Sequence, residues 1–159
     1  MSEVKRVSLS LKTKVEFGIV GGFIASFTMA VAIIILSALN VINFPYFQTL
    51  ASFFAIDGAP YEISEYGLIL FIVIEVIWGL IYAFAFKNYT VTNGVGMGAI
   101  KLFLGFIALT FTSLPEIGGN IFTITLQEAL QILVSVAIIE SIWGASIGYI
   151  GKKYLSFYT

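Results

Sequence analysis

The sequence predicts an all-α integral membrane protein, a four-transmembrane-helix bundle built from two parallel, duplicated helical hairpins. Of its 159 residues, 59% are hydrophobic and only 11% are charged, with a mean hydropathy of +1.01. Soluble domains typically contain about 25% charged residues, so too few polar side chains are present to cover a soluble fold. Four long apolar runs predict the four transmembrane helices, and an internal repeat predicts the two duplicated hairpins.

Each apolar run contains about 20 residues, enough to cross a hydrocarbon core about 30 Å thick. The runs cover residues 15–39, 64–86, 94–114 and 127–151. They divide the chain into a basic N-terminal tail (1–14), a first hairpin (15–87), a linker (88–93), a second hairpin (94–153) and a C-terminal tail (154–159). A two-span unit returns the chain to its starting side, so the two copies would be related by a pseudo-twofold axis along the membrane normal.

The basic residues predict the orientation of the spans in the cell membrane. All eight lie toward one side of the predicted bundle: Lys5, Arg6, Lys12, Lys14, Lys87, Lys101, Lys152 and Lys153. The loops on the other side contain acidic residues and no basic residue. The positive-inside rule then predicts a multi-pass protein whose N- and C-termini are both cytoplasmic.

The first outer loop contains an aromatic stretch over residues 43–54. Apolar side chains recur there at helical spacing: Tyr46, Phe47, Leu50, Phe53 and Phe54. Pro45 suits an early helix position. We therefore expect a short amphipathic helix in the outer interface. Its aromatic side chains would anchor it in the membrane, cover the bundle or contact a neighbouring protein.

A glutamate motif occurs twice, 65 residues apart. The first copy reads Ile74-Glu75-Val76-Ile77-Trp78-Gly79, and the second reads Ile139-Glu140-Ser141-Ile142-Trp143-Gly144. Seven of the sixteen paired positions from 74 to 89 are identical. We interpret the motif as a duplication. The alternative is chance similarity between two apolar helices.

Both glutamates are predicted to lie near the membrane centre, because Glu75 and Glu140 each precede a lysine by twelve residues, or about 18 Å of helix. Residues three and four apart share a helix face. Each glutamate is therefore accompanied by an indole N–H that can donate to a carboxylate and by a glycine that admits a neighbouring helix: Trp78 and Gly79 in the first copy, Trp143 and Gly144 in the second.

The sequence places no basic side chain at the depth of this intramembrane polar pair. Lys101 lies about seven residues into the third predicted span, roughly 10 Å deep, and we expect its side chain to extend outward to the cytoplasmic surface. We therefore expect both glutamates to be largely protonated unless water, an ion or a partner reaches them.

Small residues predict where the helices pack most closely, since close backbone approach is a main packing device in lipid. They recur at four-residue spacing on single helix faces: Gly18, Gly22 and Ser26, Gly94 and Gly98, and Gly144 and Gly148. This pattern is typical of helix contacts within one chain and equally of contacts between chains.

Composition also excludes several kinds of catalytic and metal-binding site. The chain has no cysteine and no histidine, which excludes disulfides, thiol chemistry, zinc sites built from these residues and histidine-ligated haem. No catalytic constellation, metal-ligand cluster or phosphate-binding loop occurs in the sequence. We expect a protein that is not an enzyme, with no metal, cofactor or nucleic-acid partner.

Three interpretations of the two glutamates remain open. They form a neutral structural lock, they bind and release protons or cations, or they contact a partner subunit. We favour a small non-catalytic, accessory subunit of a multi-subunit membrane complex, for example a respiratory or energy-coupling one. The alternative is a membrane protein that translocates protons or cations through Glu75 and Glu140. Its partners would be the lipid bilayer and either other membrane subunits or further copies of the chain.

The layout resembles the duplicated proteolipid subunit of rotary ATPases, which has two helical hairpins and a carboxylate at mid-membrane in an even-numbered span. The resemblance implies an ion-carrying position for Glu75 and Glu140. It is a resemblance of architecture rather than sequence, because the odd spans here carry bulky residues such as Phe23 and Phe27 where that family is dense in glycine and alanine.

Overall fold

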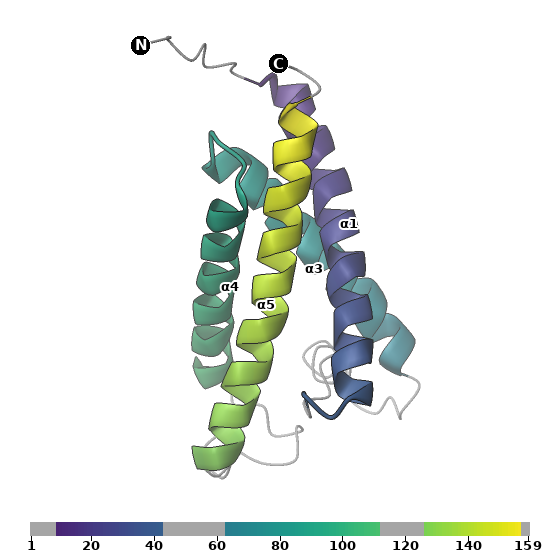
Figure 1. Cartoon of the computed structure of the whole chain (residues 1–159), viewed down its shortest axis with the longest axis vertical. Helices are drawn as coiled ribbons and strands as arrows, with labels where there is room; N and C mark the ends of the chain where they lie inside the picture. Colours follow the sequence, from purple (N-terminus) through teal and green to yellow (C-terminus); the bar gives the residue numbers. More distant parts are fainter. Residues whose placement is uncertain (1–8, 43–62, 112–125, 157–159) are drawn as a thin grey trace.

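The computed structural model of the chain describes residues 9–42, 63–111 and 126–156, and Figure 1 shows their arrangement. Four helices make up this part: α1 (Leu11–Ala38), α3 (Ile63–Ala85), α4 (Val91–Phe111) and α5 (Leu126–Leu155). No strand occurs in these ranges. The all-α prediction is confirmed, and the interfacial helix predicted at residues 43–54 lies outside the described part.

Three of the helices are long and apolar enough to cross a membrane. The qualifying stretches are Leu11–Ala38, Leu68–Ala85 and Leu130–Tyr154. Large apolar side chains on their outer faces, such as Phe27 and Ile34, are more than 60% exposed. Such a surface suits lipid and not water, which is consistent with the prediction of an integral membrane protein. The predicted third span, residues 94–114, continues past the last described residue of α4.

The helices alternate in direction, so that the start of α1, the end of α5 and the α3–α4 link lie at one end of the molecule (Figure 1). The closest helix pairs are α1 with α3, α4 with α5, and α1 with α5. The segments at this end also contain five lysines: Lys12, Lys14, Lys87, Lys152 and Lys153. The chain thus forms two hairpins, α1–α3 and α4–α5, which meet mainly where α1 packs on α5.

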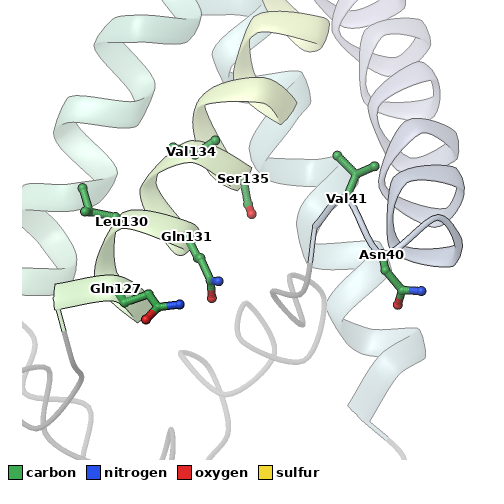
Figure 2. Close-up of a pocket in the computed structure, with 7 residues that line it drawn as sticks. All are labelled: Asn40, Val41, Gln127, Leu130, Gln131, Val134 and Ser135. Carbon is green, nitrogen blue, oxygen red and sulfur yellow. The ribbon is translucent and has the colours of Figure 1, made fainter.

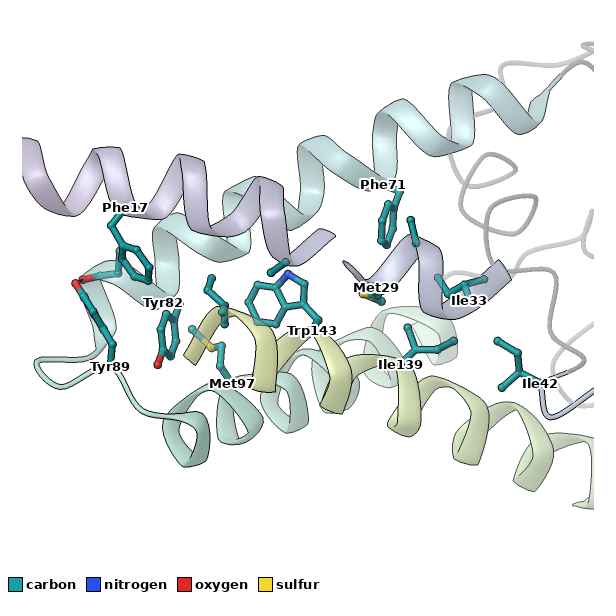
Figure 3. Packing of buried hydrophobic residues seen from close by; sticks show 14 residues of the cluster. Phe17, Met29, Ile33, Ile42, Phe71, Tyr82, Tyr89, Met97, Ile139 and Trp143 are labelled. Atoms are coloured by element: carbon teal, nitrogen blue, oxygen red, sulfur yellow. Dashed lines mark hydrogen bonds between the residues drawn. The ribbon is translucent and has the colours of Figure 1, made fainter. Parts of the chain in front are cut away.

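Buried side chains line the faces by which the helices meet, and Figure 3 shows the apolar ones between the helices. In α1, the buried residues are Phe17, Gly18, Gly21, Gly22, Ala25, Ser26, Met29, Ala30 and Ile33. In α5, they are Ser135, Ile139, Glu140, Trp143, Gly144, Ile147, Gly148 and Gly151. The near four-residue repeat places every member on the face toward the neighbouring helices.

Glycines bring the backbones of each hairpin into direct contact. A Cβ added at Gly79 of α3 would lie 2.6 Å from the Cα of Gly22 in α1. In the second hairpin, a Cβ added at Gly144 would lie 2.9 Å from the Cα of Val95. Real Cβ atoms do not approach this closely, so only glycine allows these crossings.

An aromatic cluster closes the end of the molecule where α1 begins and α5 ends. Phe17 of α1 stacks on Tyr89 of the α3–α4 link, with 4.5 Å between ring centroids, and lies 5.5 Å from Tyr154 of α5. The Tyr89 hydroxyl donates a 2.8 Å hydrogen bond to the Ala83 carbonyl. The Tyr82 hydroxyl donates to the carbonyl of Thr90 at 3.1 Å. These contacts therefore connect α1, α3, α5 and the α3–α4 link.

Replacing Tyr89 with phenylalanine tests the link. The variant keeps the ring but loses the hydrogen bond to Ala83, so we expect the free energy of unfolding in detergent micelles to fall by about 1 kcal/mol. Burial raises the pKa of the Tyr89 phenol above its ordinary value of 10.0. This contribution is therefore complete below pH 10 and is lost as the pH rises through the raised value, so alkaline destabilisation should be smaller in the variant. Equal alkaline losses in both proteins would contradict this role.

Candidate functional site

Lys101 of α4 lies between the two glutamates of the repeated motif. Its Nζ is 2.5 Å from Oε2 of Glu75 on α3 and 2.6 Å from Oε2 of Glu140 on α5. All three side chains are buried, with exposed fractions between 2 and 6%. We call Glu75, Lys101 and Glu140 the buried triad.

The α4 sequence explains how lysine reaches this position. Gly94, Met97, Gly98 and Lys101 lie on one face of α4, all buried, at the spacing of successive helical turns. Gly98 packs against the backbone carbonyl of Glu140, which draws α4 close to α5. Lys101 follows one turn later, and its side chain therefore meets the carboxylates beside this crossing.

The predicted position of Lys101 was wrong, and so was the premise that no basic side chain reaches the glutamates. The estimate of depth started at residue 94, whereas α4 begins at Val91, directly after a short link. Lys101 is ten residues from that start, and Glu75 is ten residues from Ala85, the last residue of α3. The two side chains therefore lie at the same depth, about 15 Å from the ends of their helices.

Trp143 contributes its ring face to the triad. The Lys101 Nζ lies 3.9 Å from the ring centroid, well within the range of a cation–π interaction. Trp143 is fully buried between the helices (Figure 3). Its indole N–H has no hydrogen-bond partner within the described part of the chain, so the expected donation to a carboxylate is not seen. Trp78, its counterpart in the first motif, is half-buried and packs against the apolar core.

The other predicted residues are small, and most of them support the site by letting the helix backbones approach closely. Gly22 and Gly98 occupy matching places: a Cβ on Gly22 would lie 3.1 Å from the Glu75 carbonyl oxygen, and Gly98 meets the Glu140 carbonyl. Gly18 and Gly79 contact each other, Gly94 contacts Gly144, and Gly148 contacts the start of α4. The Ser26 hydroxyl is buried and donates to the Phe23 carbonyl at 2.7 Å, so it serves α1 itself.

The charge of the triad is unbalanced. Two carboxylates and one ammonium, all ionised, carry one net negative charge in a buried site. The ammonium of Lys101 is the cation that contacts both carboxylates, and no group of three metal-ligating side chains occurs within the described residues. A buried charge without compensation is costly. The triad is neutral only when it holds one further proton or cation.

A groove of about 670 Å³ opens where α1 ends and α5 begins, and Figure 2 shows the residues that line it. Its walls come from the segment that follows α1 and from the first turns of α5: Asn40, Val41, Gln127, Leu130, Gln131, Val134 and Ser135. Ser135 is its buried member, with 5% exposure. Five residues, or about 7.5 Å of helix, separate Ser135 from Glu140, and the buried Ile139 lies between them in the sequence.

Comparison with known proteins leaves the triad as the main guide to function. No protein-family model matches the chain, and no curated protein or solved structure is significantly similar to it.

The sequence analysis identified both carboxylates of the triad but not the lysine that lies between them. The signal was present, because Gly94, Gly98 and Lys101 fall on one helix face.

Proposed function

We propose that this chain is a four-span membrane protein that binds and releases a proton, or an equivalent small cation, at the buried triad during translocation across the membrane. One observation carries the proposal: two buried carboxylates share the ammonium of Lys101. Ionisable side chains at such depth are costly and commonly mark proton relays and ion pathways. The sequence analysis gave proton or cation translocation as the alternative to an accessory subunit, and the position of Lys101 between the two glutamates now favours translocation.

The second carboxylate is what distinguishes an exchange site from a structural lock. One Glu–Lys pair would already be neutral, and well-packed apolar residues often stabilise a buried site as well as an ion pair does. The second carboxylate adds no stability unless it holds a proton or a cation. It does provide a place where one positive charge can bind and leave.

The helix contacts support the proposed duplication. Gly22 and Gly98 meet the backbones of Glu75 and Glu140 in the same way. Tyr89 and Tyr154, which are 65 residues apart, both pack on Phe17. In the register that pairs Gly22 with Gly98, Ala25 of the first half occupies the place of Lys101, so the second half alone contributes a lysine at this position. We also propose that both termini are cytoplasmic, because lysines gather where α1 begins and α5 ends.

The triad lies where transporters with internal repeats place their ion sites. In such proteins, the coupling ion binds near the midplane at the interface between repeats, and one repeat moves against the other. Here Glu75 belongs to the first hairpin, whereas Lys101 and Glu140 belong to the second. A charge that binds at this junction would influence how the hairpins pack together.

Proton flux into liposomes tests the proposal. With purified protein in the membrane and a pH-sensitive dye inside, we expect an acid pulse to drive proton entry. Glu75→Gln combined with Glu140→Gln should reduce entry to the rate of protein-free liposomes. Glu16→Gln is the matched control, because Glu16 is half-exposed and pairs with Lys12 at 3.7 Å away from the triad. Unchanged flux in the double variant would rule out translocation through the triad.

The accessory-subunit proposal also has an observation in its favour. The triad side chains are almost fully buried, as in a permanent bridge between helices. In that role the outer apolar faces would contact lipid and other subunits. Native mass after mild solubilisation separates the two proposals: a complex with other proteins supports the accessory role, and a monomer or homo-oligomer that conducts protons contradicts it.

A further inference from the structure

The three contacts of Lys101 are divided unequally between the hairpins. Glu140 and Trp143 both lie on α5, three residues apart on one face, and both contact the ammonium. Glu75 is its ion-pair partner on α3, across the boundary between the hairpins. Two of the three interactions would therefore stay intact if the hairpins moved apart.

Backbone packing makes Lys101 part of the α4–α5 hairpin. Gly98 lies against the Glu140 carbonyl, and a Cβ at Gly148 would come within 2.8 Å of the Cα of Val91. The pair α3 and α4 is not among the closely packed helix pairs, although a short link joins the two helices. Movement between the hairpins would thus change the distance from Lys101 to Glu75 before it changed the distance to Glu140.

Within the described residues, the charged groups that face Glu75 are Lys101 from α4 and Glu140 from α5. The α1 face packed beside it contributes Gly22 and other small, uncharged residues. When the hairpins separate, Glu75 loses its only cation in this set, while Lys101 and Glu140 remain a neutral pair. A carboxylate left alone in an apolar site must take up a proton.

We propose that Glu75 is the carboxyl group that exchanges the proton. We call its ion pair with Lys101 the latch, because this pair joins the two hairpins, and protonation of Glu75 breaks it. Trp143 is a positioning residue in this scheme, because its ring face holds the ammonium on the α5 side. The proton binds to a Glu75 carboxylate oxygen as the Lys101–Glu75 ion pair opens, and it leaves when the pair reforms. This inference rests on the proposed proton exchange and adds which carboxylate exchanges and what moves.

Infrared difference spectroscopy assigns the carboxyl group. In the wild type, we expect acidification to produce the band of one protonated carboxyl group in an apolar site. Glu75→Asp should shift this band, and Glu140→Asp should leave its position unchanged. A shift in Glu140→Asp alone would overturn the inference and leave the proposed function standing. The absence of any such band in the wild type would overturn both.

The role of Trp143 has a separate test in the pH midpoint of that band. Trp143→Phe keeps an aromatic face and should keep the midpoint close to the wild-type value. Trp143→Leu removes the face and should move the midpoint. A residue that only fills space would leave the midpoint in place in both variants, and that result would overturn the positioning role.

Spin-label distances test the latch. The chain has no cysteine, so labels can be placed at chosen sites. Ile77 on α3 and Phe103 on α4 are half or more exposed and belong to different hairpins, whereas Phe103 and Val134 belong to the same one. We expect acidification to lengthen the 77–103 distance and not the 103–134 distance. In Glu75→Gln, the 77–103 distance should be long at every pH. A wild-type 77–103 distance that does not depend on pH would refute the latch.

Discussion

Replacing Lys101 with methionine is expected to lower the free energy of unfolding by about 3–5 kcal/mol at neutral pH, since removal of one partner leaves buried charge uncompensated. Methionine keeps much of the volume of the lysine stem. It leaves Glu75 and Glu140 near one another with no cation between them. The loss should shrink as the pH falls, because protonated carboxyl groups no longer repel each other. Unfolding in mixed micelles over a range of pH measures both effects.

Removal of the carboxylates together with the lysine is the control for this prediction. The variant Lys101→Met, Glu75→Gln, Glu140→Gln should recover most of the lost stability, because buried ion networks can be replaced by uncharged residues at little cost. It should also unfold with little dependence on pH below neutrality. If Lys101→Met alone were as stable as the wild type at neutral pH, Lys101 would not be the buried partner of both glutamates.

Replacing Gly144 with alanine is expected to cost about 3 kcal/mol or more, because a methyl group would be forced into a backbone contact. The new Cβ would lie 2.7 Å from the carbonyl carbon of Gly94 and 2.9 Å from the Cα of Val95. Helix α4 must then move away from α5, which also moves Lys101 relative to Glu140. Thermal unfolding in detergent and the pH midpoint of proton uptake should therefore change together.

Gly96→Ala, on the facing helix α4, is the matched control for Gly144→Ala on α5. A Cβ at Gly96 has no neighbour within 4 Å, so alanine there should be neutral or stabilise α4 by up to about 1 kcal/mol through helix propensity. Similar losses in Gly144→Ala and Gly96→Ala would show that the α4–α5 crossing does not depend on backbone contact at Gly144.

Hydropathy predicted the helices well but placed some of their ends too early or too late. The first span was predicted to begin at residue 15, whereas α1 begins at Leu11. Ser10 caps this helix, with its side chain accepting a hydrogen bond from the Thr13 N–H, and the polar first turn includes Lys12. Hydropathy detects the part of a helix that lies in hydrocarbon, whereas capping and backbone hydrogen bonds decide where the helix ends.

Local sequence patterns predicted the two glutamates of the triad but not the position of Lys101. Each glutamate could be found from its place in an apolar run, because a local pattern is enough to reveal a buried charge. The partner of both glutamates could not be found from depth alone, since depth counted from residue 94 placed Lys101 too near the surface. Which face of Trp143 meets the lysine depends on helix packing, and nothing in the repeated motif encodes it.

The most direct test of the site is a distance measurement by solid-state NMR in lipid bilayers, with nitrogen-labelled lysine and carbon-labelled glutamate carboxyl groups. We expect the Lys101 Nζ to show strong dipolar couplings to the carboxyl carbons of both Glu75 and Glu140, and its N–H protons to exchange slowly with water. A Lys101 Nζ that couples to neither carboxyl carbon and exchanges as fast as those of Lys152 and Lys153 would contradict the buried triad.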